Sequence, residues 1–72
     1  MDMRQLRENQ GLRTVDVASK VDVAESTVRN WEYGKTIPRL RIDQIDALLK
    51  LYGCTFDELF AAVKESGENA KK

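Results

Sequence analysis

Four residues that tolerate left-handed backbone angles divide this chain into short stretches of helical periodicity. Gly11, Asp22, Gly34 and Gly53 each follow a run in which apolar residues recur every three or four positions. Glycine ends helices because it adopts positive φ angles without strain, and aspartate tolerates such angles better than most residues. The sequence has no strand-like alternation of polar and apolar residues. The pattern predicts an all-α protein with helices over residues 2–10, 14–21, 25–33, 42–52 and 55–63.

The apolar residues of these stretches predict one shared core. Residues three and four apart lie on the same side of a helix, so each predicted helix has one apolar face. A chain of 72 residues corresponds to one domain, which buries about 60% of the surface of the unfolded chain. The side chains expected to point inward are Met3, Leu6, Val17, Ala18, Val21, Val28, Trp31, Ile42, Ile45, Leu48, Leu49, Tyr52, Phe56, Leu59, Phe60 and Val63.

The end of the chain has a different composition. Residues 64–72 are polar and contain no apolar residue larger than Ala70. Such a segment has little apolar surface with which to dock on a core. We therefore expect a folded domain over residues 1–63 and a frayed polar tail over residues 64–72.

The composition argues against catalysis and metal binding. Cys54 is the single cysteine, and the chain has no histidine. The commonest zinc ligands and pairs of nucleophile and general base are therefore missing, and we expect no enzyme, no metal and no cofactor. No apolar run reaches the roughly 20 residues that span a bilayer, and residues 1–10 lack the apolar core of a signal peptide. These features predict a cytoplasmic protein without a membrane partner.

The charges are unevenly distributed although they cancel overall. The formal net charge is +0, from 12 basic and 12 acidic residues, whereas nucleic-acid-binding domains are usually basic. Residues 29–41, however, contain four basic residues and only Glu32 as an acid. The local charge determines the electrostatic field at a docking surface, so this segment remains compatible with an anionic partner.

The predicted helix over residues 25–33 has two different sides. Val28 and Trp31 lie on its inner side, whereas a polar stripe follows the positions i, i+1, i+4, i+5 and i+8 on the outer side. An inward tryptophan is a core anchor and not a platform for stacking bases. The outer stripe consists of Glu25, Ser26, Arg29, Asn30 and Tyr33.

Several segments resemble one family of DNA-binding domains. The run Trp31-Glu32-Tyr33-Gly34-Lys35, the following Pro38 and the run from Leu51 to Leu59 are similar to the lambda-repressor-like, Cro-type (XRE) helix-turn-helix family. Ala18 in the second predicted helix and Val28 in the third also lie at the relative spacing of that family. The resemblance covers residues 4–61.

The resemblance implies a compact five-helix bundle with a helix-turn-helix at the second and third helices. In this arrangement the second helix crosses the DNA backbone and the third enters the major groove. It also implies an ion pair between Arg7 and Glu32 that orients the third helix. This sequence departs from the family pattern at Asp22, where a glycine is usual, and at Ala24, where a serine or threonine commonly caps the helix. Its connection after Pro38 is also longer.

The outer stripe supplies candidate base-reading residues. Asparagine can bind adenine through two hydrogen bonds, arginine can bind guanine in the same way, and glutamate can accept from a cytosine amino group. The alternative is a solvated helix face on which Glu25 and Arg29 form an i, i+4 ion pair. The residues assigned to base reading are Glu25, Ser26, Arg29 and Asn30.

Cations and hydroxyls around the predicted helix-turn-helix are candidate contacts to phosphate. Such contacts fix the register of a protein on the duplex without reading its sequence. Each one can also be ordinary surface charge, and this alternative is strongest for the arginines after Pro38. The candidates are Arg13, Thr14, Lys35, Thr36, Arg39 and Arg41.

These observations together predict a sequence-specific transcriptional regulator that binds double-stranded DNA and acts as a repressor. One module of this size reads few bases, so a homodimer on a palindromic operator is expected. Two alternatives remain open: an antitoxin that combines DNA binding with a toxin partner, and a protein-interaction adaptor that has lost DNA binding. The neutral net charge and Glu25 on the outer stripe support the adaptor.

Overall fold

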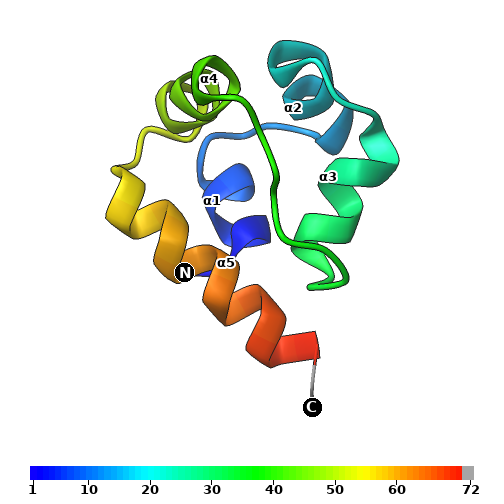
Figure 1. Cartoon of the computed structure of the whole chain (residues 1–72), viewed down its shortest axis with the longest axis vertical. Coiled ribbons are helices and arrows are strands. Elements are labelled where there is room, and N and C mark those ends of the chain that lie inside the picture. The colour runs from blue at the N-terminus through cyan, green and yellow to red at the C-terminus, as the bar shows by residue number, and fades with distance from the viewer. Residues whose placement is uncertain (71–72) are drawn as a thin grey trace.

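The computed structural model describes residues 1–70, which form five helices and no strand. Figure 1 shows α1 in the middle of the molecule, with the other helices arranged around it. The all-α prediction is confirmed. Within the described residues, no helix has the length and apolar character needed to cross a membrane. The helices are α1 (Met3–Asn9), α2 (Thr14–Val21), α3 (Glu25–Glu32), α4 (Ile42–Tyr52) and α5 (Phe56–Ala70).

Side chains beside the helix ends bind backbone N–H groups that the helices leave unpaired. Before α1, the Gln5 N–H donates to Asp2 Oδ1 and the Asp2 N–H donates to Gln5 Oε1, both at 2.9 Å. Thr55 and Glu58 form the same reciprocal arrangement at α5, with distances of 2.9 and 3.2 Å. These capping boxes fix where the two helices begin.

The turn between α2 and α3 depends on a left-handed residue. Asp22 has a φ angle of 64°, and among the described residues it is the one non-glycine with a positive φ. This conformation brings the Val23 N–H to 3.0 Å from the Ala18 carbonyl. Aspartate therefore adopts the left-handed conformation that the turn requires, at a small cost in strain relative to glycine.

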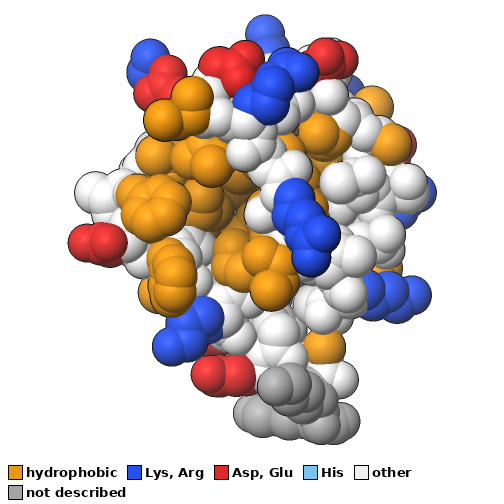
Figure 2. Space-filling view, in the orientation of Figure 1, with side chains coloured by type: hydrophobic (Ala, Val, Ile, Leu, Met, Phe, Trp, Pro, Cys, Tyr) orange, Lys and Arg blue, Asp and Glu red, His pale blue; other side chains and the backbone are white. Residues whose placement is uncertain are grey.

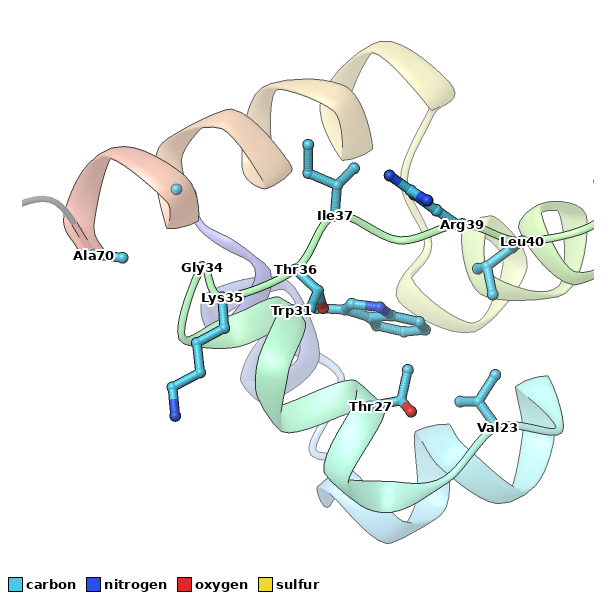
Figure 3. A pocket seen from close by; sticks show the side chains of 11 residues that line it. Val23, Thr27, Trp31, Gly34, Lys35, Thr36, Ile37, Arg39, Leu40 and Ala70 are labelled. Carbon is cyan, nitrogen blue, oxygen red and sulfur yellow. The ribbon is translucent and has the colours of Figure 1, made fainter.

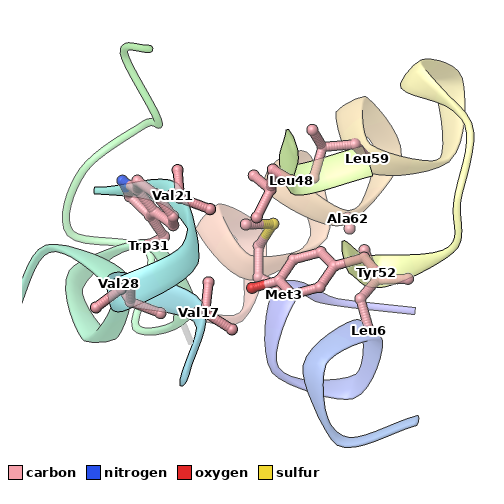
Figure 4. Packing of buried hydrophobic residues seen from close by; sticks show 11 residues of the cluster. Met3, Leu6, Val17, Val21, Val28, Trp31, Leu48, Tyr52, Leu59 and Ala62 are labelled. Carbon is pink, nitrogen blue, oxygen red and sulfur yellow. The ribbon is translucent and has the colours of Figure 1, made fainter. Parts of the chain in front are cut away.

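The core lies around α1. Figure 4 shows Met3 between the buried side chains of α2 and α3 and those of α4 and α5. Cys54 is half-buried at the edge of this core, and burial raises the pKa of its thiol. The buried apolar side chains are Met3, Leu6, Val17, Ala18, Val21, Val28, Trp31, Leu48, Tyr52, Leu59 and Ala62.

Three large apolar residues expected in the core are on the surface. Phe56, Phe60 and Ile42 are 54%, 56% and 87% exposed. Leu59 and Ala62 set the inner side of α5, and this orientation turns the two phenylalanines outward. Ile42 is the first residue of α4 and precedes the part of that helix that packs on the core. The prediction that these three side chains point inward is wrong.

Helix α5 is longer than the sequence pattern predicts. It continues through residues 64–70, which were expected to fray, while Lys71 and Lys72 lie outside the described residues. Ser66 is 1% exposed, and its Oγ accepts a hydrogen bond of 3.0 Å from the Met3 N–H. Asn69 also donates to Asp2 Oδ2 at 3.2 Å. Polar contacts to the beginning of α1 thus hold a segment that has few apolar residues.

The end of α5 also packs closely against the turn after α3. Gly34 has a φ angle of 73°, and a Cβ atom placed there would clash with the Ser66 carbonyl and lie 2.8 Å from Ala70 Cβ. Only a glycine fits this combination of backbone angle and close approach. The second half of α5 therefore supports the loop that carries Lys35.

We expect Ser66→Ala to lower the free energy of unfolding by about 1–3 kcal/mol, because the buried Met3 N–H would lose its partner. Chemical denaturation of the full chain measures this change. Glu68→Ala, at an exposed position of the same helix, is the control and should change the value by less than about 0.5 kcal/mol. Equal effects of the two substitutions would contradict a structural role for the Ser66 hydroxyl.

Candidate nucleic-acid interface

Helices α2 and α3 form a two-helix unit whose inner side is apolar. Val28 and Trp31 of α3 are 0% and 2% exposed, and Ala18 of α2 is buried beside them. The small alanine lets the two helices approach closely. Helix α3 begins after Ala24, whose side chain makes no capping hydrogen bond. The N–H groups of the first turn of α3 therefore have no side-chain cap from this residue.

A nearly buried ion pair fixes the end of α3. Arg7 Nε lies 2.7 Å from Glu32 Oε2, and Arg7 Nη2 lies 3.0 Å from Glu32 Oε1. The two side chains are 13% and 5% exposed. Arg7 Nη1 also donates to the Leu12 carbonyl at 2.9 Å. The hydrogen bonds with Glu32 raise the pKa of Arg7 above its usual value, so the guanidinium stays charged.

The outer side of α3 presents the four proposed base-reading residues. Ser26 and Arg29 are exposed, whereas Glu25 and Asn30 are partly exposed. In the described chain, the side chains of Ser26 and Asn30 make no hydrogen bond, which leaves their donors and acceptors available. Tyr33 is 58% exposed beside this row. Helical spacing places the row on the side opposite Trp31.

Glu25 is engaged by two neighbouring side chains. Arg29 Nη1 donates to Glu25 Oε1 at 2.5 Å, and Thr14 Oγ1 donates to the same oxygen at 3.1 Å. The Glu25 and Arg29 side chains remain 41% and 45% exposed. One carboxylate therefore links the first turn of α2 to the guanidinium of Arg29 on the outer side of α3.

The proposed phosphate contacts fall into two groups. Arg13 is paired with Asp16 and Arg41 with Asp43, at 3.2 and 3.3 Å. The hydrogen bonds from Arg13 lower the pKa of Asp16, although Arg13 is exposed and Asp16 is partly exposed. Within residues 1–70, no ion pair engages Lys35 or Arg39. Thr36 is exposed next to Lys35.

The loop after α3 separates Lys35 from Arg39. Figure 3 shows the Lys35 side chain extending away from Trp31, whereas Arg39 lies across a hollow on the side of α5. This hollow has a volume of about 920 Å³ and lies against the inner edge of α3, beside Thr27 and Trp31. Lys35 thus lies next to the C-terminal end of the outer stripe of α3, whereas Arg39 lies away from this stripe.

The match to known families agrees with this geometry. The family model described as a helix-turn-helix domain matches residues 2–63. The chain belongs to the helix-turn-helix domain family. A search of curated proteins and a search of solved structures gave no match.

Membership in the helix-turn-helix family indicates DNA binding. In such domains the second helix of the motif lies in the major groove while the first crosses the backbone. Here these helices are α3 and α2. The family consists of binding modules that are typically non-enzymatic.

Two features of this interface were not predicted from the sequence. The contact between Thr14 and Glu25 joins residues 11 positions apart in different helices, and the support of Gly34 by α5 joins even more distant segments. The spacing of Arg29 and Glu25 did indicate their ion pair. The other contacts carry no local signal, because they depend on how the helices pack.

We expect Glu32→Gln to lower the free energy of unfolding by about 3–5 kcal/mol, because it leaves the Arg7 charge nearly buried without its partner. Thermal and urea unfolding of the full chain measure this effect. The control is Glu8→Gln, which removes an exposed ion pair with Arg4 and should cost less than about 1 kcal/mol. A similar small cost for both variants would show that the buried pair does not hold α3.

Proposed function

We propose that this chain is a sequence-specific transcriptional regulator of the lambda-repressor-like, Cro-type kind. It binds a palindromic DNA operator as a homodimer and represses transcription by occupying that site. The observation that carries the proposal is the outer row of α3, which presents the unengaged side chains of Ser26 and Asn30 on a helix anchored by the pair of Arg7 and Glu32. Rigid anchoring matters because hydrogen bonds to base edges require defined side-chain positions.

In this proposal, α3 lies in the major groove and reads base edges through Ser26, Arg29 and Asn30. Asn30 binds an adenine and Arg29 binds a guanine, each through two hydrogen bonds. Glu25 contributes indirectly by holding the Arg29 guanidinium, in addition to accepting from a cytosine amino group where one is within reach. The distance of 2.5 Å between Arg29 Nη1 and Glu25 Oε1 supports this positioning role.

Contacts to the DNA backbone fix the register of α3 on the duplex. Lys35 and Thr36 follow the C-terminal end of α3, where their N–H groups already donate to the Asn30 carbonyl at 3.0 and 3.4 Å. Thr14 and Arg13 begin α2 on the other side of the groove. Three of the arginines contact phosphate only after a change in side-chain position. Arg13 is paired with Asp16, Arg41 is paired with Asp43, and Arg39 lies beside α5.

The adaptor alternative is favoured by two observations. The carboxylate of Glu25 lies on the reading side of α3, and the net charge of the chain is +0. A surface of this kind repels phosphate more than a typical DNA-binding surface does.

Selection from a random duplex library at low salt distinguishes the regulator from the adaptor. Enrichment of a palindrome supports the regulator, whereas failure to enrich any sequence supports the adaptor.

We expect Asn30→Ala to reduce discrimination at one base pair of the selected operator, because a bidentate contact contributes about 1–3 kcal/mol of discrimination. Competition binding with operators that differ at single positions measures the loss. Asn9→Ala, at an exposed position of α1, is the matched control and should retain the full pattern. Unchanged discrimination in Asn30→Ala would refute its role as a base reader.

We expect Glu25→Gln to raise affinity for non-specific DNA and to lower the ratio of specific to non-specific affinity by about tenfold, within the range of one bidentate contact. The substitution removes a negative charge near the phosphates and releases Arg29 from its ion pair. Binding to operator and to scrambled duplex at one salt concentration gives the ratio. Glu8→Gln removes an equivalent exposed i, i+4 pair on α1 and is the control. A ratio that Glu25→Gln leaves unchanged would exclude the positioning role.

A further inference from the structure

We propose that the hollow between α3, the loop after α3 and the end of α5 binds a small organic carboxylate with an apolar body, and that the bound ligand keeps Arg39 away from the DNA backbone. The inference rests on the proposed function, because it assigns a regulation to the proposed DNA complex. The hollow, shown in Figure 3, is bordered by Thr27 and Trp31 of α3, by Ile37 and Arg39 of the loop and by Ala70 of α5.

Arg39 differs from the other arginines of the chain in its charge partners. Every other arginine lies within 3.3 Å of an aspartate or glutamate oxygen, whereas no ion pair engages Arg39 or Lys35 within residues 1–70. Both cations line the hollow, and none of the described residues that line it is an aspartate or a glutamate. In Figure 2, apolar and basic side chains surround this loop, while the acidic side chains lie toward the edges of the face. The hollow is therefore complementary to an anion.

The rest of the wall is apolar and carries two hydroxyl groups. Val23, Trp31 and Leu40 supply apolar surface. The hydroxyls are those of Thr27 and Thr36, whose side chains make no hydrogen bond within residues 1–70. Ligand sites commonly combine an apolar lining with a few polar groups and have volumes of roughly 300–1,000 Å³, a range that includes the volume of about 920 Å³ of this hollow. A matching ligand has an apolar body and one anionic group.

A carboxylate fits the guanidinium of Arg39. The two groups form a pair of parallel hydrogen bonds, as Arg7 does with Glu32 in this chain. With its carboxylate held by Arg39, the ligand places its apolar body against Trp31 and Leu40. Inorganic phosphate offers a comparable charge but no apolar body, so it leaves this part of the wall in water.

Gly67 leaves the α5 side of the hollow open. It lies inside α5, where glycine is less favourable than alanine. Unlike Gly34, it has no positive φ, and a Cβ atom placed there would meet no atom within 4 Å. The fold of the described chain therefore does not require a glycine at this position. A larger side chain at Gly67 would instead occupy space in the hollow that this residue lines.

The ligand competes with DNA for Arg39 and leaves the base-reading residues accessible. None of Ser26, Arg29 and Asn30 lines the hollow. Arg39, by contrast, contacts phosphate in the proposed complex only after its side chain has moved. A ligand carboxylate holds this side chain in the hollow, so the ligand and a phosphate exclude each other there. Because such coupling is reciprocal, DNA weakens ligand binding by the same factor by which the ligand weakens DNA binding.

Trp31 reports directly on the hollow, because it is the single tryptophan of the chain and lines the site. Its fluorescence and the NMR signal of its indole N–H are followed while hexanoate, cyclohexylacetate or 4-phenylbutanoate is added to the full chain. We expect a saturable change with at least one of them, in the millimolar range or below. Hexan-1-ol and 4-phenylbutan-1-ol lack the charge, inorganic phosphate lacks the apolar body, and each should bind at least about tenfold more weakly.

Two results of these titrations overturn the ligand site. One is the absence of a saturable change with all three carboxylates. The other is equal binding by the alcohols or by inorganic phosphate, because the hollow would then recognise only one of the two features of the ligand.

Two substitutions alter the hollow in different ways. Arg39→Gln removes its cation and Gly67→Leu fills its space, and each should weaken binding of the best carboxylate at least about tenfold. The matched controls are Arg41→Gln, at a paired arginine outside the hollow, and Glu68→Leu, at an exposed position beside Gly67. Both controls should retain binding, and circular dichroism verifies that each variant folds. Unchanged binding in either Arg39→Gln or Gly67→Leu overturns the assignment of the site.

The salt dependence of operator binding tests the competition with DNA. At saturating ligand, the slope of log affinity against log salt should fall in magnitude by about 1, which corresponds to the loss of one phosphate contact. Arg39→Gln should show the smaller slope with and without ligand. A slope that the ligand leaves unchanged in the unmodified chain overturns the competition.

The failure of this inference is distinguishable from the failure of the proposed function. A chain that binds the carboxylate but enriches no DNA sequence refutes the proposed function and leaves the ligand site in place. A chain that enriches a palindrome but binds none of the three carboxylates refutes the ligand site alone.

Discussion

The ion pair between Arg7 and Glu32, whose side chains are both largely buried, joins α1 to the end of α3. The two hydrogen bonds between Arg7 and Glu32 restrict the rotation of α3, whereas Val28 and Trp31 restrict its depth in the core. Arg7 also binds the Leu12 carbonyl and so holds the turn between α1 and α2. One side chain thereby fixes three segments relative to one another. The orientation of the outer stripe of α3 depends on this ion pair, because separating a buried charge from its partner costs a large amount of free energy.

Only some side chains of the outer stripe of α3 are free of hydrogen bonds to other side chains. Ser26 and Asn30 have unengaged side chains, but Glu25 binds both Thr14 and Arg29. A pre-positioned arginine loses less rotamer freedom when it binds a base than a free one does. The same carboxylate reduces the positive potential at the groove. For the proposed DNA complex, we infer that this arrangement favours discrimination between sequences over affinity for DNA in general, in line with the neutral net charge of the chain.

Helix α5 has two sides with different surroundings. Its inner side carries Leu59 and Ala62 into the core and Ser66 against the first residue of α1. Its outer side carries Phe56 and Phe60. The helix also approaches the backbone of Gly34 so closely that no side chain fits there. Helix α5 thus packs against both the beginning of α1 and the turn after α3.

The sequence by itself determined the five helices, their turns at Asp22, Gly34 and Gly53, and the inward position of Val28 and Trp31, because these depend on local backbone preference and helical period. The resemblance of its motifs also indicated the pair of Arg7 and Glu32 before any geometry was known. Only the tertiary structure decided which side of α5 is buried, since Leu59 and Phe60 are equally apolar and the choice depends on what packs against the helix. It also decided that residues 64–70 continue the helix, because polar Ser66 is held by a backbone group 63 positions away. Contacts between distant segments have no local sequence pattern. These contacts set the orientation of α3 and leave the phenylalanines of α5 exposed.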